Sequence, residues 1–75
     1  MKLFFQNSQG ISRQLAICTN QEEVFAEINN FINICNKNKP IDRQFKSYYT
    51  RIWTDNEKTW YDVGSHSEFF YTEYN

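Results

Sequence analysis

Glycine, proline and histidine are scarce in this chain of 75 residues, which contains two, one and one of them. Gly10 and Gly64 stand far apart, so the sequence has no glycine-rich loop that could cradle a phosphate group. The two cysteines, Cys18 and Cys35, are too few for a disulfide framework and lack the spacing of a zinc site. With one histidine and scattered carboxylates there is no metal-ligand pattern either. We therefore expect no metal and no cofactor, and we interpret both cysteines as small buried hydrophobic residues.

Residue types that are common in active sites, serine, histidine and glutamate, occur close together only in the string Gly64-Ser65-His66-Ser67-Glu68. Serine, histidine and glutamate suggest a hydrolase, but successive residues of a strand point to opposite faces. His66 and Ser67 are then not placed to act as base and nucleophile. The favoured interpretation is a structural histidine in a turn. We therefore expect that the protein is not an enzyme.

Neither sign of charge dominates, because eight Lys and Arg face nine Asp and Glu for a net charge of −1. This balance indicates neither a polyanion-binding protein nor a DNA mimic. Five basic residues nevertheless gather in one stretch that has Asp42 as its single acid: Lys37, Lys39, Arg43, Lys46 and Arg51. Ordinary solvated charge explains such a distribution, and a nucleic-acid contact is the alternative.

Long apolar runs are missing as well. The chain turns polar at Gln6 after Leu3-Phe4-Phe5, so we expect neither a signal peptide nor a membrane span, and a cytoplasmic location. What is abundant is aromatic: seven Phe, five Tyr and two Trp make up 19% of the residues. Residues 1–75 are expected to form a single small domain with a thin core. Aromatic side chains, which bury on the order of 150–250 Å² each, can compensate for its small size.

Hydrophobic periodicity predicts the first elements. Leu3 to Gln6 and Ile11 to Thr19 are strand-like runs around a polar turn with Gly10, which is typical of a hairpin. Thr19 to Glu22 has the spacing of a capping box and predicts a helix start. A helical stripe follows, and Pro40 prevents its continuation. The stripe consists of Val24, Phe25, Ile28, Phe31, Ile32 and Cys35.

A second hairpin is predicted from Phe45 to Val63, with its turn centred between Asn56 and Glu57. Cross-strand pairing then sets Thr54 opposite Thr59, Trp53 opposite Trp60, Ile52 opposite Tyr61 and Arg51 opposite Asp62. One face carries Tyr49, Arg51, Trp53, Trp60 and Asp62. The other face carries Tyr48, Thr50, Ile52, Tyr61 and Val63, and we expect the helix to cover Tyr48, Ile52, Tyr61 and Val63, because aliphatic residues suit its stripe.

After a bend at Gly64-Ser65, the segment from His66 to Tyr71 either resumes as a strand or ends as an extended tail. The predicted order is β-β-α-β-β. Its simplest packing is an α+β fold with a four-stranded, mostly antiparallel sheet and one helix packed on one face.

A single helix covers only one face of a sheet, so part of the aromatic surplus must lie on the other. Trp53 and Trp60 either staple the hairpin or lie under the tail, or they form an exposed patch rimmed by charge, as binding surfaces do. The candidate protein-binding residues are Tyr49, Arg51, Trp53, Trp60 and Asp62. The partner would be a host protein or a second copy in a homodimer. Nucleic acid stacked on the same aromatics, with Lys37, Lys39, Arg43, Lys46 and Arg51 on its phosphates, is the alternative.

The string Trp60-x-Asp62-x-Gly64-Ser65-His66-x-Glu68-Phe69-Phe70 resembles a segment of small uncharacterised proteins encoded by phages and prophages of Gram-positive bacteria. The resemblance extends from Tyr48 to Tyr71, about a third of the chain, and brings no assigned catalytic or binding residues. It implies a small accessory protein in the cytoplasm of a bacterial host. Such accessory proteins often bind a host protein, and some inhibit bacterial defence systems such as CRISPR nucleases.

Overall fold

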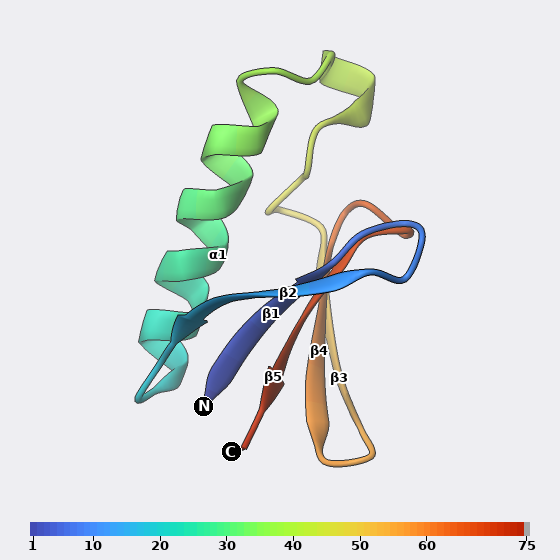
Figure 1. The fold of residues 1–75 in the computed structure, drawn as a ribbon. Helices are drawn as coiled ribbons and strands as arrows, with labels where there is room; N and C mark the ends of the chain where they lie inside the picture. The colour runs from blue at the N-terminus through green and yellow to red at the C-terminus, as the bar shows by residue number, and fades with distance from the viewer. Residues whose placement is uncertain (75) are drawn as a thin grey trace.

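A computed structural model describes residues 1–74 of the chain as an antiparallel sheet with one long helix on one face (Figure 1). The elements in chain order are β1 (Lys2–Gln6), β2 (Ser12–Ile17), α1 (Gln21–Asn36), the 3-10 helix η1 (Ile41–Arg43), β3 (Thr50–Asp55), β4 (Lys58–Val63) and β5 (Phe69–Glu73). The sheet order is β2-β1-β5-β4-β3, and every neighbouring pair is antiparallel. The predicted α+β class is confirmed.

Residues 1–74 contain five strands, so the prediction of four was wrong by one. The segment after Gly64 continues as β5, which pairs with β1 on one side and β4 on the other. Phe70, the second residue of β5, lies opposite both Phe5 and Tyr61. β5 therefore lies between the two hairpins and pairs with one strand of each. Without it, β1 and β4 would each have an unpaired edge, which is why this segment forms a strand.

The first hairpin is confirmed, and Asn7 shapes its turn. The Asn7 Oδ1 accepts hydrogen bonds from the backbone N–H groups of Gln9 at 2.9 Å and Ile11 at 3.0 Å. Gly10 follows with a φ of +82°, a value that glycine adopts without strain. The β1–β2 register shifts between Leu3 and Phe4, so this edge of the sheet carries a bulge.

Helix α1 begins one residue later than the predicted capping box. Asn20 is the N-cap, and its Oδ1 accepts from the N–H of Glu23 at 2.9 Å. Glu23 in turn accepts from the N–H of Thr19 at 2.8 Å. The capping-box spacing of three residues occurs twice in the sequence, from Thr19 to Glu22 and from Asn20 to Glu23. The helix ends at Asn36, ahead of Pro40 as expected.

The second hairpin has the predicted register, with Trp53 opposite Trp60 and Arg51 opposite Asp62. Its turn residues Asn56 and Glu57 have φ values of 49° and 66°, as a type I′ turn requires.

Only one strand of this hairpin lies beneath the helix. Tyr61 and Val63 of β4 are buried, whereas Ile52 is 51% and Tyr48 85% exposed. Ile52 lies on the helix side of the sheet with Tyr61, as expected, but the expectation that Ile52 and Tyr48 are covered by the helix was wrong. The reason is that β3 is the outermost strand, at the margin of the area that α1 covers, and that Tyr48 lies in the turn before it.

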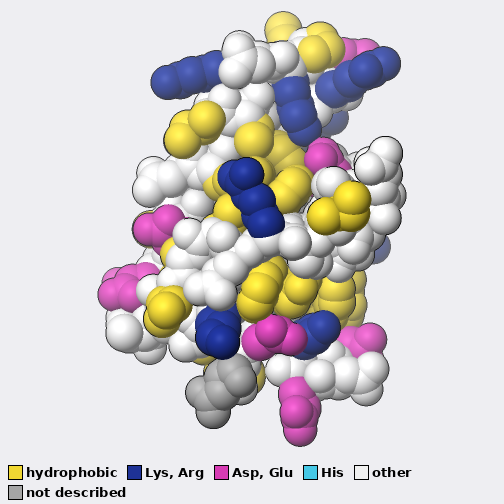
Figure 2. All heavy atoms as spheres, in the orientation of Figure 1, with side chains coloured by type: hydrophobic (Ala, Val, Ile, Leu, Met, Phe, Trp, Pro, Cys, Tyr) yellow, Lys and Arg dark blue, Asp and Glu magenta, His cyan; other side chains and the backbone are white. Residues whose placement is uncertain are grey.

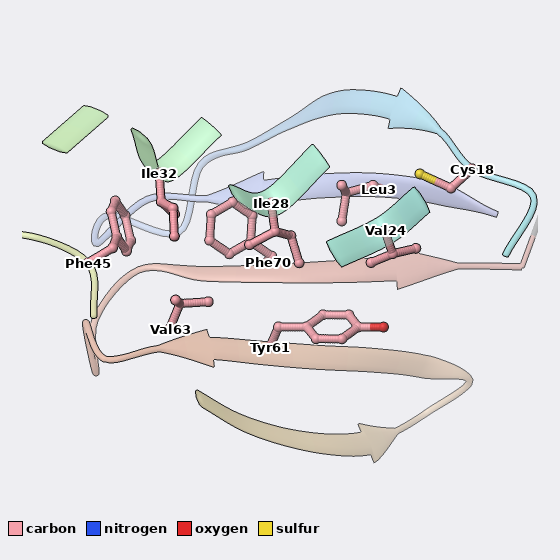
Figure 3. Packing of buried hydrophobic residues seen from close by; sticks show 9 residues of the cluster. All are labelled: Leu3, Cys18, Val24, Ile28, Ile32, Phe45, Tyr61, Val63 and Phe70. Carbon is pink, nitrogen blue, oxygen red and sulfur yellow. The ribbon is translucent and has the colours of Figure 1, made fainter. Parts of the chain in front are cut away.

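The core lies between α1 and the three inner strands (Figure 3). Phe70 is fully buried there, with ring centroids 5.3 Å from Phe5, 5.5 Å from Phe31 and 5.9 Å from Phe45. The buried hydroxyl of Tyr61 accepts a hydrogen bond from the Nε2 of Gln21 at 2.7 Å. The buried cluster is Leu3, Cys18, Val24, Ile28, Ile32, Phe45, Tyr61, Val63 and Phe70.

Both cysteines are free thiols, and Cys18 is buried as expected while Cys35 is half-buried. Burial raises the pKa of the Cys18 thiol, and the nearby carboxylates of Glu23 and Glu27 raise it further. A raised thiol pKa keeps the thiolate, the reactive form, scarce at neutral pH. Cys18 thus behaves as a small core residue.

Candidate functional site

An aromatic cluster lies on the face of the sheet opposite α1. Side chains alternate between the two faces of a strand, so the neighbours of core residues Phe5, Tyr61 and Phe70 point away from the helix. Five of these aromatic side chains contact one another across four strands, and we call this group the aromatic surface: Phe4 of β1, Phe69 and Tyr71 of β5, Trp60 of β4 and Trp53 of β3.

The rings of the aromatic surface contact one another in an unbroken series. Trp53 and Trp60 are stacked, with centroids 6.3 Å apart and planes 9° apart, and Phe69 meets both edge-on at 5.9 and 6.2 Å. Trp60 continues to Tyr71 at 4.7 Å, and Tyr71 stacks on Phe4 at 5.0 Å. Rings held by their neighbours lose little rotamer freedom when a partner binds. The surface is therefore pre-organised for contact.

Exposure rises across the aromatic surface toward β3. Tyr71 is 7% exposed, Phe4, Trp60 and Phe69 are half-buried, and Trp53 is 39% exposed. Figure 2 shows hydrophobic side chains reaching the surface below the centre of the view, above a row of basic and acidic side chains. Phe69 of β5 thus packs beside both Trp rings, and Trp53 remains partly exposed.

Charged side chains rim the aromatic surface and are mostly paired. Lys58 Nζ lies 3.6 Å from Glu73 Oε2 and 4.8 Å from the ring centroid of Tyr71. The guanidinium of Arg51 lies 5.9 Å from the ring of Trp53 and donates to Asp62 at 2.8 Å. Such a rim orients a partner through electrostatics without carrying a strong net field.

Asp62 is fully buried, although its pairing with Arg51 had placed it among the candidate contact residues. Its Oδ2 accepts from Arg51 Nη2 at 2.8 Å and lies 3.2 Å from His66 Nδ1. Its Oδ1 accepts from the backbone N–H groups of Ser65 at 3.1 Å and His66 at 3.0 Å. Burial alone would raise the pKa of Asp62, but these hydrogen bonds outweigh it and hold the pKa below its usual value. Asp62 therefore anchors the loop that follows β4.

That loop, residues 64–68, is built for a tight bend. Gly64 has a φ of +72°, and a Cβ there would lie 2.7 Å from the Cβ of Lys46, so only glycine fits. The Oγ of Ser65 accepts from the N–H of Glu68 at 3.0 Å and lies 3.4 Å from the Oγ of Ser67. The ring of His66 contacts Asp62 and, edge-on at 5.6 Å, Tyr49. The geometry places His66 in a turn beside a carboxylate.

Three of the five candidate nucleic-acid residues share one hollow. Lys39, Arg43 and Lys46 line it together with Ser65 and Ser67, and its volume is about 610 Å³. Lys39 already has an ion-pair partner, because its Nζ lies 3.1 Å from Glu68 Oε1, and the same Nζ lies 4.2 Å from the ring centroid of Phe45. In the described part of the chain, the other two candidates, Lys37 and Arg51, do not line this hollow.

The structure brings together most of the candidate protein-binding residues. Arg51, Trp53, Trp60 and Asp62 share the face away from α1, whereas Tyr49 precedes β3 and contacts His66.

Sequence reasoning missed Phe4, Phe69 and Tyr71. The period-two pattern from Phe69 to Glu73, which places Phe70 and Thr72 on the buried face, was the signal that could have found two of them.

No family model matches this chain, and comparisons with curated proteins and with solved structures return no match. Within residues 1–74, His, Cys, Asp and Glu side chains do not gather into any group of three or more that could hold a metal ion. No helix in the same residues has the length and apolar character needed to cross a membrane.

Proposed function

We propose that this chain is a non-enzymatic protein-binding module that contacts its partner through the aromatic surface and Arg51. One observation carries the proposal: Trp53 is 39% exposed although its ring is held between Trp60 and Phe69. Tryptophan and arginine are the residues most enriched at the energetic centres of protein interfaces. A rigid aromatic group with a charged rim supplies both the apolar area and the orientation that such an interface needs.

Electrostatics favours a protein over a nucleic acid on this surface. Binding to nucleic acid depends on basic side chains that neutralise phosphates. The basic rim residues are each paired with a carboxylate, Arg51 with Asp62 and Lys58 with Glu73. The field over the aromatic rings is accordingly weak.

The resemblance to phage and prophage proteins points to the kind of partner. The shared string runs from Trp60 to Phe70 and includes two rings of the aromatic surface, Trp60 and Phe69. We propose a host protein of a bacterium as the partner, with inhibition of a defence system, anti-CRISPR-like, as the biological role.

Replacement of Trp53 tests the proposal. Trp53→Ala should weaken partner binding by at least about 30-fold, the effect expected for an interface hot spot. The fold should remain, because Trp53 lies on an edge strand and is partly exposed. A partner captured from the bacterial host and identified by mass spectrometry would then be titrated against both proteins, with circular dichroism to check folding.

Tyr48→Ala is the matched control, since Tyr48 is 85% exposed and does not belong to the aromatic surface. It should bind as the wild type does. Equal capture by wild type, Trp53→Ala and Trp60→Ala would contradict the proposal.

A nucleic-acid contact is the second candidate, favoured by the hollow that Lys39, Arg43 and Lys46 share. Our proposal predicts no measurable binding of a single-stranded oligonucleotide even at about 50 mM salt, where phosphate contacts are strong. Fluorescence anisotropy of a labelled oligonucleotide is the measurement. Affinity that falls steeply with added salt and is lost in Lys46→Ala would instead support the second candidate.

A further inference from the structure

The two edges of the sheet differ in how they are protected. The ladder between β1 and β2 carries a register shift, and such bulges discourage the addition of another strand. At the opposite edge, β3 pairs with β4 without any shift, and all six of its residues are exposed. Its sequence, Thr50 to Asp55, contains β-branched and aromatic residues and neither Gly nor Pro. This edge is therefore a regular template for strand pairing.

The turn geometry tells which backbone groups of β3 are free. Residues that flank a two-residue type I′ turn exchange both of their backbone hydrogen bonds, and the pattern alternates along an antiparallel pair. Asp55 flanks the turn, so it directs its N–H and C=O toward β4, as do Trp53 and Arg51. The N–H and C=O groups of Thr50, Ile52 and Thr54 consequently point outward.

Apolar side chains flank this edge on both faces of the sheet. On the helix side, Ile52 is 51% exposed and lines a groove of about 360 Å³ together with Phe25 and Ile28 of α1. On the other side, Trp53 is 39% exposed. A strand added to β3 would reduce the exposure of both side chains.

We propose that the added strand is β3 of a second copy, so that two chains form one continuous antiparallel sheet about a twofold axis. A twofold axis perpendicular to the sheet pairs residues that point to the same face. Because neighbouring residues of a strand point to opposite faces, the residue on the axis must lie opposite the same residue of the second copy. The pairing is then centred on that residue. Centring on Arg51 would set two like charges opposite each other, which is unfavourable. Centring on Ile52 gives Thr50, Ile52 and Thr54 all a hydrogen-bonding partner, whereas centring on Trp53 leaves Thr50 without one.

The Ile52-centred register is self-complementary in its side chains. Ile52 meets Ile52 of the second copy, and Thr50 meets Thr54, a β-branched pair that suits a sheet. Arg51 lies beside Trp53 of the second copy and repeats the Arg–Trp contact that exists within one chain at 5.9 Å. No like charges face each other between residues 50 and 54. The pairing also sets the two aromatic surfaces side by side, and it does not depend on the proposed function.

The test is the oligomeric state, measured by sedimentation equilibrium from micromolar to millimolar concentration. The wild type should pass from the monomer mass of 9.1 kDa to twice that value. Ile52→Lys puts two ammonium groups opposite each other and should raise the dimer Kd about 100-fold or more. Ile41→Lys makes the same chemical change at a residue that is 83% exposed in η1, and it should dimerise as the wild type does.

A charge-swap experiment reports the register itself. Ile52→Lys and Ile52→Glu should each be monomeric, and their mixture should form a heterodimer because the two charges then face each other. Should either variant lose its circular dichroism spectrum, Thr54→Pro provides the same test, since it removes only an outward N–H. The proposal is overturned by a wild type that stays monomeric throughout, by Ile52→Lys or Thr54→Pro that dimerises like the wild type, or by a mixture of folded variants that stays monomeric.

Discussion

Phe70→Ala is expected to lower the free energy of unfolding by about 3–5 kcal/mol, the cost of removing a fully buried phenylalanine ring. Phe70 is 0% exposed and packs against Phe5 of β1, Phe31 of α1 and Phe45 of the connection to β3. The cavity would therefore open at the point where these elements meet. A domain of this size has a total stability of roughly 4–11 kcal/mol, so much of the variant should be unfolded on mild heating.

Urea titration followed by far-UV circular dichroism measures this loss. Phe69→Ala is the matched control, because Phe69 is the adjacent residue of β5, points to the other face and is half-buried. It should cost only about 1–2 kcal/mol. An equal loss for the two variants would mean that the faces of β5, or its central place in the sheet, are wrongly assigned.

Local sequence signals were enough to predict the second hairpin. A polar two-residue turn and alternating side chains specify the register, and the pairs from Thr54–Thr59 to Arg51–Asp62 are all confirmed. The helix was equally predictable. Its apolar stripe and its capping residues placed its start within one residue of the observed one. These features depend on residues that are close in sequence.

The order of the strands depends on residues that are far apart in sequence, and it was not predictable. β5 lies between two hairpins, so one strand of each becomes an edge. This position explains why Ile52 of β3 is exposed although Tyr61 and Val63 of β4 are buried. It also explains why Tyr71 belongs to the aromatic surface, since β5 brings it between Trp60 and the N-terminal strand.

At the candidate site, the surroundings of Asp62 were also only partly predictable from the sequence. Cross-strand pairing predicted its partner, Arg51, and that pair is present at 2.8 Å. The loop that closes over the carboxylate comes from the backbone of Ser65 and His66, whose amide directions follow from the positive φ of Gly64 and His66. A residue chosen as a surface contact is therefore a buried anchor, and it acts on the aromatic surface by holding Arg51.

Asp62→Asn should lower the free energy of unfolding at pH 7 by about 2–3 kcal/mol, the value of a hydrogen bond to a charged group. The amide oxygen can still accept from Ser65 and His66, but the amide N–H₂ would face the guanidinium of Arg51, donor against donor. The loss is smaller than for a fully buried ion pair, because the Arg51 side chain is 57% exposed and can turn to water.

The difference between wild type and Asp62→Asn should also depend on pH. The folded state holds the pKa of Asp62 below that of an unfolded aspartate, which is about 3.9. The carboxylate therefore stabilises the fold above that pH, and the stabilisation is lost as the pH falls through the folded pKa. Urea titrations at decreasing pH should show the two proteins converging below about pH 4.

Asp55→Asn is the control, since Asp55 is exposed at the turn of the same hairpin. It should match the wild type closely at pH 7. A difference between wild type and Asp62→Asn that stays constant down to pH 3, or the absence of any difference at pH 7, would show that the Asp62 carboxylate does not anchor the loop. Because the carboxylate of Asp62 holds the guanidinium of Arg51 beside Trp53, Asp62→Asn should also weaken partner binding in the protein that remains folded.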